Sequence, residues 1–195
     1  MTKPELPMSV LDAIYKRRSV RSFSSERLDQ ATIRSLLAAA VHAPTAIHEE
    51  PWAFVIIQDA GALKRLSDRA KPFFLDEMQR AHLDRGGHTL DKFKSPDFNI
   101  FYDASTLVVI CARSAGPFVV ADCWLAAENL MLAACAMGLG TCVIGSAVLG
   151  LNDRNVKAEF GIPADVSAIA PVIVGVPRGE TPAVPRKEPQ VVVWK

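Results

Sequence analysis

The sequence carries almost no net charge, because its 22 lysine and arginine residues are balanced by 21 aspartate and glutamate residues. This balance gives no general electrostatic reason to bind nucleic acid or an anionic membrane surface. No uncharged apolar stretch reaches about 18 residues, and the N-terminal MTKPELPMSV has no apolar signal-peptide core, so neither membrane spanning nor secretion is predicted. We therefore expect a cytoplasmic protein that binds neither nucleic acid nor membrane.

The sequence also lacks the short motifs of several enzyme classes. It has no P-loop and no G-x-S-x-G nucleophile elbow, and the glycines of MGLGTCVIG follow a helical pattern instead of a strand, unlike a dinucleotide fingerprint. Its cysteines form no C-x-x-C pair and lie in apolar stretches, which is typical of buried thiols in a reducing compartment. They are Cys111, Cys123, Cys135 and Cys142. No metal site is expected.

The stretch APTAIHEEPW, residues 43–52, places a histidine and two carboxylates in a loop of small residues. An H-E-x-x-H metal motif is excluded, because the fifth position is Trp52 and Pro51 would break the helix that this motif needs. Loops carry function more often than cores do. His48 and Glu50 are therefore candidate binding residues, with solvent exposure as the alternative.

The length and the hydrophobic pattern predict one domain over residues 1–195. A capping box at Ser9 and Asp12 predicts a short first helix. Further helices are expected at residues 29–41, 59–70, 72–83, 122–137 and 152–160, and strands at residues 53–57, 106–112, 141–144 and 168–176. Residues 84–98 show no period and are predicted to form a mobile surface loop, a candidate lid.

Two features suggest a second subunit. The helix at residues 122–137 is apolar nearly all round, so it is buried in the core or against another chain. Residues 177–190 form a proline-rich arm that ends in VVVW, which is predicted to be a strand. A strand at the end of a long arm is expected to pair with a distant sheet, such as that of a partner chain.

Two clusters allow both a functional and a purely structural interpretation. KRRSVRSF, residues 16–23, holds guanidinium groups and a hydroxyl that suit a phosphate with an attached polyol, but cations also favour a helix C-terminus. Gly138, Gly140 and Gly145 let the backbone approach a flat ligand, or they end a helix and form a tight turn.

Taken together, RRSVRSF, LLAAAVHAPT, EPWAFVII, FYDAS, AENLMLAACAMGLGTCVIG and FGIP occur in an order that resembles the nitroreductase-like flavoprotein family over essentially the whole chain. The resemblance implies an α+β fold with a mostly antiparallel sheet between helices. It also implies a domain-exchanged homodimer, whose arm at residues 177–195 crosses to the partner, with FMN at the dimer interface.

The resemblance also implies roles for individual residues. Those expected at the FMN phosphate and ribityl chain are Arg17, Arg18 and Ser19, with Arg186 and Lys187 at the basic C-terminal end of the phosphate site. Arg21 is expected near the ribityl and the N1/O2 edge, where a positive charge stabilises the reduced flavin. Ile144 and Gly145 match the backbone near N5 and O4. The loop expected against the partner's flavin includes Pro44, Thr45, Ala46, His48 and Glu50.

This loop departs from the family pattern Pro-Ser-x-x-Asn-x-Gln-Pro-Trp. Thr45 keeps the hydroxyl, His48 replaces the asparagine and can either donate or accept, and Glu50 replaces the glutamine. An ionised Glu50 only accepts hydrogen bonds, which suits a ribityl hydroxyl but not a flavin carbonyl. The exact contacts with the ring therefore depend on this loop.

The expected function is that of an oxidoreductase using FMN and NADH or NADPH, with ping-pong reduction of nitroaromatic, quinone or related acceptors. Two alternatives remain open. One is other chemistry on the same scaffold, namely reductive dehalogenation, dehydrogenation or flavin breakdown. The other is a flavin-binding or sensory protein with little turnover.

Overall fold

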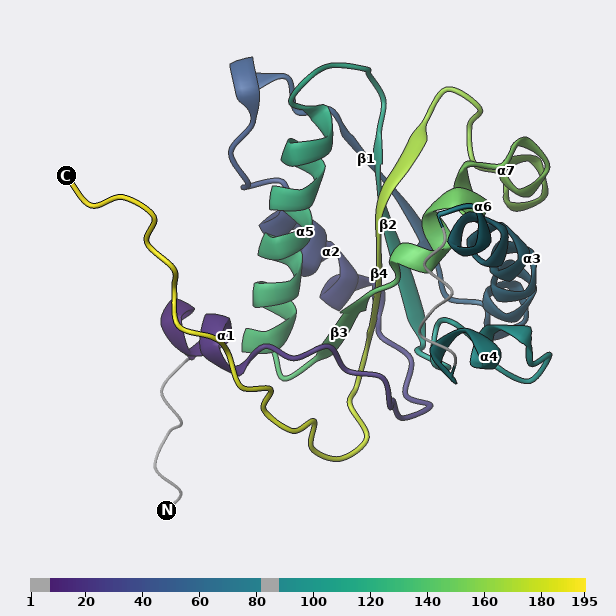
Figure 1. Cartoon of the computed structure of the whole chain (residues 1–195), viewed down its shortest axis with the longest axis horizontal. Helices are drawn as coiled ribbons and strands as arrows, with labels where there is room; N and C mark the ends of the chain where they lie inside the picture. Colours follow the sequence, from purple (N-terminus) through teal and green to yellow (C-terminus); the bar gives the residue numbers. More distant parts are fainter. Residues whose placement is uncertain (1–7, 82–87) are drawn as a thin grey trace.

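In the computed structural model, which describes residues 8–81 and 88–195, four antiparallel strands form one sheet between two layers of helices (Figure 1). The strands are β1 (Trp52–Ile57), β2 (Thr106–Ala112), β3 (Gly140–Val143) and β4 (Ser167–Gly175), in the order β1-β2-β4-β3. β1 and β3 are therefore the edge strands. The predicted α+β fold with an antiparallel sheet is confirmed.

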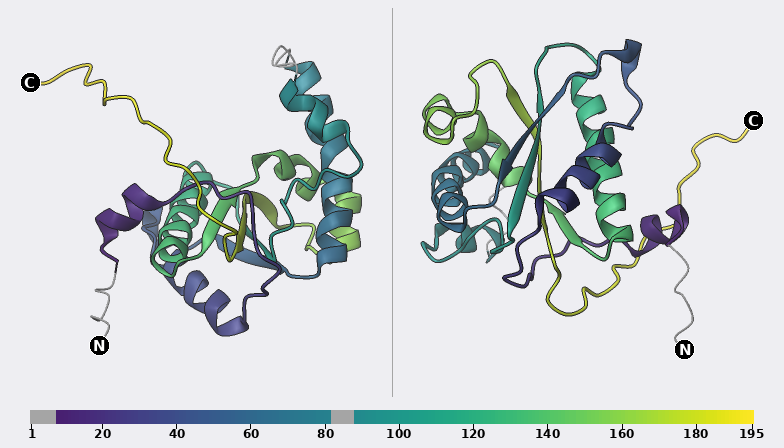
Figure 2. Two further views of the ribbon diagram at one scale, coloured as in Figure 1. Left: turned by 90° about the horizontal axis from the view of Figure 1, so that it is seen from below. Right: turned by 180° about the vertical axis from the view of Figure 1, so that it is seen from behind.

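Helices cover both faces of the sheet (Figures 1 and 2). α2 (Gln30–Ala40) and α5 (Val119–Ala136) pack on one face, where Leu36 and Leu130 are fully buried. The opposite face is covered by α3 (Ala60–Arg80), α4 (His88–Lys94), α6 (Val148–Asn152) and α7 (Arg154–Phe160). β2 is buried along its whole length, as its continuous apolar sequence predicts. α1 (Val10–Lys16) lies against α5.

Local capping residues account for several helix boundaries. Ser9 and Asp12 form the predicted capping box of α1. Asp29 and Asp59 accept backbone N–H bonds at the starts of α2 and α3, and Asp153 does the same for α7. Gly138 has φ 73° directly after α5, so it is the predicted helix stop.

The expected helix break at Pro72 is wrong. α3 runs without interruption from Ala60 to Arg80 with Pro72 inside it. Pro72 is exposed, so water can satisfy the carbonyl that its missing N–H leaves without a partner. Packing holds both halves in line, because Leu66 is buried before the proline and Phe74 stacks on Phe93 after it, with ring centroids 4.7 Å apart.

The predicted loop at residues 84–98 is wrong at residues 88–94, which form α4, and is confirmed at residues 95–98, while residues 82–87 lie outside the described residues. α4 begins at His88, and the segment after it is anchored to α3. The buried ammonium group of Lys71 donates to the carbonyl oxygens of Ser95 and Phe98 at 3.0 and 2.9 Å. These long-range bonds fix a segment that shows no hydrophobic period of its own.

The helix expected at residues 152–160 is α7, which begins two residues later, at Arg154, because Asp153 caps it. The short helix α6 before it was not predicted. The helix expected at residues 122–137 begins three residues earlier, at Val119. VVVW forms no strand within its own chain, where Val192 and Trp194 are each 89% exposed. Its pairing with a second chain stays a prediction.

Among the described residues, α5 is long and apolar enough to span a membrane by length and composition, a test that a core helix also passes. Its inner face is packed on the sheet, with Ala126, Leu130 and Ala134 fully buried. The predicted buried thiols are confirmed for Cys111, Cys123 and Cys142, whereas Cys135 is only partly buried. Burial raises the pKa values of Cys111 and Cys123 to about 12 and about 11.

Candidate functional site

The segment at residues 17–21 leaves α1 and runs beside β3. Ser19 forms a parallel bridge with Thr141, and the Val20 N–H donates to the Thr141 carbonyl oxygen at 2.9 Å. A Cβ atom on Gly140 would lie 2.9 Å from the Val20 side chain, so glycine allows this close approach. Gly140 therefore allows packing against Val20 within the chain, a role that neither interpretation of the sequence gave it.

A cationic cavity of about 170 Å³ opens where this segment begins. Its lining combines Lys16, Arg17 and Arg18 with Cys135, the start of β3 and the first residues of the C-terminal arm. The Arg17 side chain is only 19% exposed, and its Nε lies 3.9 Å from a carboxylate oxygen of Glu128. Arg18 donates from Nη1 to the Tyr15 carbonyl oxygen at 2.6 Å. The helix-end interpretation is therefore observed for Arg18, although both Arg17 and Arg18 line the cavity.

Neither cysteine beside the site is a ready nucleophile. Burial raises the pKa of Cys135, although the nearby Arg17 and Arg18 act in the opposite direction. Burial also raises the pKa of Cys142, with Arg21 and Ser19 opposing it. Because the thiolate is the reactive form, both groups are predominantly neutral thiols at neutral pH.

A second cavity, of about 90 Å³, lies at the other end of the same segment. Its lining residues are Arg21, Phe93, Ile100, Tyr102, Cys142, Val143, Ile144, Gly145 and Ser146. Gly145 is exposed, its φ is not positive, and a Cβ atom there would meet no atom within 4 Å. The fold itself does not require glycine at this position, whereas a ligand lying close to the backbone would.

The same two segments, residues 16–21 and 139–146, contribute different residues to the lining of both cavities. Arg18 and Arg21 are three residues apart, which is about 10 Å in an extended chain. One end of the site offers cations, and the other offers aromatic side chains, an arginine and an open backbone. The arrangement suits an elongated ligand with an anionic group at one end and a flat ring at the other.

The loop at residues 44–50 has an unusual backbone. Ile47, His48 and Glu50 have φ values of 51°, 55° and 45°, in the left-handed region that glycine favours. The Ala46 N–H donates to Asp122 Oδ1 at 3.4 Å, and Ser114 Oγ donates to Glu49 Oε1 at 2.7 Å. Pro44, His48 and Glu50 are exposed, whereas Thr45 and Ala46 are half-buried.

The same chain does not bring this loop to the two cavities. The loop is tied to Asp122 in the first turn of α5, and Cys135 of the cationic cavity lies near the end of that helix. Figure 1 shows the loop beside the start of α5 and α1 near the other end of the helix. Asp122 and Cys135 are thirteen positions apart, which corresponds to about 20 Å of helix. The loop therefore lies far from the cationic cavity of its own chain.

The C-terminal arm leaves the sheet after β4 and extends away from the body of the protein (Figure 2). Pro177, Gly179 and Thr181 line the cationic cavity. Arg186 and Lys187 lie farther along the arm, exposed and outside the cavity lining. Their contact with a phosphate stays a prediction.

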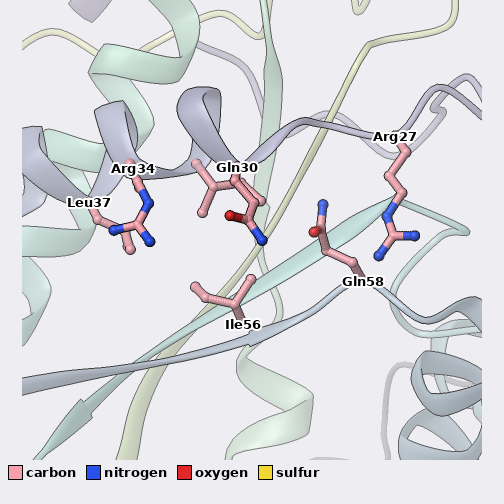
Figure 3. Close-up of a pocket in the computed structure, with 7 residues that line it drawn as sticks. Arg27, Gln30, Arg34, Leu37, Ile56 and Gln58 are labelled. Atoms are coloured by element: carbon pink, nitrogen blue, oxygen red, sulfur yellow. The ribbon is translucent and has the colours of Figure 1, made fainter.

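A groove of about 450 Å³ lies beside the free edge of β1. In Figure 3, Ile56 and Gln58 face Gln30, Arg34 and Leu37 of α2 across it. No pattern in the sequence predicted this groove. Tyr102, which lines the second cavity, was not predicted either, because its position depends on a backbone turn with no local sequence signal.

A sequence model described as the Nitroreductase family matches residues 14–176. A protein of Archaeoglobus fulgidus, whose name assigns it as an NADH dehydrogenase/NAD(P)H nitroreductase, is 29% identical over 175 residues, covering 87% of this chain and 86% of that protein. An iodotyrosine deiodinase of Thermotoga neapolitana is 25% identical over 183 residues, covering 91% of this chain and 93% of that protein.

The fold is also similar to that of solved structures. A nitroreductase with bound FMN from Bacteroides fragilis superposes with a TM-score of 0.81 at 25% identity. The similarity covers 95% of this chain and 98% of that chain. The arrangement of sheet and helices is therefore shared along almost the whole of both proteins.

Proposed function

The chain belongs to the nitroreductase family, and we propose that it is an FMN-dependent oxidoreductase that takes electrons from NADH or NADPH. The family prediction is thereby confirmed. The observation that carries the functional proposal is the pair of cavities that residues 16–21 and 139–146 line together. Its two ends differ in charge in the way that a phosphate ester attached to a flat ring requires.

The cationic cavity is the proposed phosphate end. Arg17 would hold the phosphate through charge-assisted hydrogen bonds, and the exposed Ser19 hydroxyl would bind it or the adjoining polyol. Glu128, 50% exposed, only partly neutralises Arg17, because exposed ion pairs are weak. The cavity therefore keeps positive charge for an anion. Arg186 and Lys187 would close this end of the site when the arm folds over it.

The second cavity is the proposed ring end. Arg21 would place positive charge at the edge of the ring, and the backbone at Ile144 and Gly145 would approach it closely. Bound FMN would supply the redox chemistry, accepting hydride from the nicotinamide and passing electrons to a second substrate in ping-pong order. The protein's part is to bind, orient and set the electrostatic environment. This explains why no acid–base pair is conspicuous near Gly145.

The site is proposed to be complete only in a homodimer. α5 exposes Val120, Trp124 and Leu125, an apolar surface suited to burial against a second copy. The loop at residues 44–50 would then reach the ring end of the partner's site. The free edge of β1 and the groove beside it would receive Val191 to Trp194 of the partner's arm, because an exposed apolar edge strand is otherwise an aggregation hazard.

The proposed acceptors are nitroaromatic compounds, quinones and related flat molecules. Phe93 and Tyr102 give the ring end the aromatic walls that favour such substrates. Reductive dehalogenation is a second candidate, supported by the similarity to an iodotyrosine deiodinase. A flavin-binding protein with little turnover is the alternative from another functional class.

Purification and steady-state kinetics test the proposal. The purified protein should be yellow and should release FMN on denaturation. Oxidation of NADH or NADPH should then accelerate on addition of a quinone or nitroaromatic acceptor. Absence of FMN would refute the proposal, whereas bound FMN without turnover would favour the binding protein. Iodotyrosine as the acceptor, with iodide release as the readout, tests the second candidate separately.

A further inference from the structure

Tyr102 has a backbone conformation that its residue type disfavours. Its φ is 52° and that of Asp103 is 54°, so two successive residues other than glycine lie in the left-handed region. Aspartate tolerates this region, but a bulky residue there is an outlier. Such strain persists only where the surrounding structure enforces it, and it clusters at functional sites.

The turn at residues 99–104 enforces the conformation of Tyr102. The Tyr102 N–H donates to the Asn99 carbonyl oxygen at 2.9 Å, and Asn99 Nδ2 donates to Asp103 Oδ1 at 2.9 Å. The flanking Phe101 and Ala104 are buried, so the turn cannot shift without disturbing the core. Tyr102 is thus fixed from both sides in its strained conformation.

The strained turn places the Tyr102 ring between Phe98 and Arg21. The Phe98 ring meets it edge-on, with centroids 5.7 Å apart and an interplanar angle of 81°. The guanidinium carbon of Arg21 lies 5.9 Å from the Tyr102 ring centroid, within the range of a cation–π interaction. Arg21 and Tyr102 both line the second cavity, which Gly145 also lines.

Arg21 has no carboxylate partner among residues 8–81 and 88–195. It is exposed, and a long exposed side chain samples many rotamers unless a contact restrains it. The Tyr102 ring supplies such a contact without neutralising the charge. A carboxylate in the same place would fix the side chain but cancel its field.

We infer that Tyr102 is a positioning residue that holds the Arg21 guanidinium at the ring end of the site. The inference rests on the proposed function, since the Arg21 charge then lies where negative charge accumulates when the flavin is reduced. With the Tyr102 ring removed, Arg21 is free to turn into solvent. The reduced flavin loses stabilisation, and the midpoint potential falls.

The test measures the two-electron midpoint potential of FMN-loaded parent and variants by dye-equilibrated titration. Tyr102→Leu is expected to lower the equilibrium constant for reduction about tenfold, equal to about 30 mV for a two-electron couple. Tyr102→Phe keeps the aromatic face and should match the parent. Tyr102→Gly removes the ring and relieves the strained φ. It should lower the midpoint potential as Tyr102→Leu does, and it should be at least as stable to heat as Tyr102→Leu.

A double-mutant cycle separates positioning from a direct effect. Arg21→Ala should lower the potential at least as much as Tyr102→Leu, and the double variant should match Arg21→Ala alone. Equal potentials for parent, Tyr102→Leu and Tyr102→Gly would overturn the inference, as would additive effects in the double variant. A parent protein that binds no FMN would overturn the proposed function as well, which distinguishes the two failures.

Discussion

Asp122 Oδ1 accepts a hydrogen bond from the Ala46 N–H at 3.4 Å, while its Oδ2 is buried without a partner among the described residues. Asp122 lies in the first turn of α5, where the helix dipole favours a negative charge. It is the one long-range contact in the described hydrogen-bond network that ties the strained loop at residues 44–50 to α5. This pairing connects the loop proposed to serve the partner's site with the helix proposed to form the interface.

Asp122→Ala is expected to release this loop. Removing the buried acceptor and its favourable charge should lower the free energy of unfolding by about 1–2 kcal/mol. Amide hydrogen exchange at residues 45–48 should accelerate. Ser114→Ala is the matched control, because it removes the exposed hydrogen bond to Glu49 and should change stability less. Unchanged exchange in Asp122→Ala would show that the loop is held by other contacts.

Arg17→Ala and Ser19→Ala are expected to weaken FMN binding. Loss of one charge-assisted contact costs about 1.5–3 kcal/mol, so the affinity should fall at least about tenfold for Arg17→Ala. Titration of apoprotein with FMN, followed by flavin fluorescence, measures this. Arg69→Ala is the charge-matched control, since Arg69 pairs with Glu159 elsewhere on the protein. If Arg17→Ala and Ser19→Ala both bind FMN as tightly as the parent does, the basic cluster at residues 16–23 serves only as a helix end.

Deletion of residues 190–195 is expected to weaken the homodimer, because it removes the apolar segment proposed to cover the partner's β1 edge. Light scattering over a micromolar dilution series should show that the truncated dimer dissociates at a higher protein concentration than the parent dimer does. Ile56→Glu, on the receiving strand, should have the same effect. Val184→Ala, an exposed change in the arm before the strand, is the control. A parent that is monomeric with FMN bound would contradict the exchanged dimer.

Glu50→Gln is expected to raise the flavin midpoint potential. A unit charge about 6 Å from the ring at an effective dielectric constant of about 20 contributes about 3 kcal/mol before screening, and about 1.4 kcal/mol corresponds to 30 mV for two electrons. Glu49→Gln is the matched control, because the neighbouring Glu49 binds Ser114 of its own chain. Equal potentials for parent and Glu50→Gln would show that Glu50 faces water.

Much of the fold was predictable because its signals are local. The capping residues Ser9, Asp29 and Asp59 each accept from an amide three residues away, and Gly138 ends α5 by its own backbone freedom. The apolar runs of β1 and β2 likewise predict strands by their composition. For the site, the sequence grouped Arg17, Ser19 and Arg21, which are close in the chain and lie along one side of β3.

Tertiary structure alone decided the features that depend on distant contacts. α3 continues through Pro72, and the segment after α4 is ordered by Lys71, because packing and buried hydrogen bonds outweigh weak local preferences. Tyr102 takes a strained φ that no local pattern predicts, since the energy that enforces it comes from a buried turn. The length of α5 separates the loop at residues 44–50 from the cationic cavity of its own chain, a separation that exists only in three dimensions.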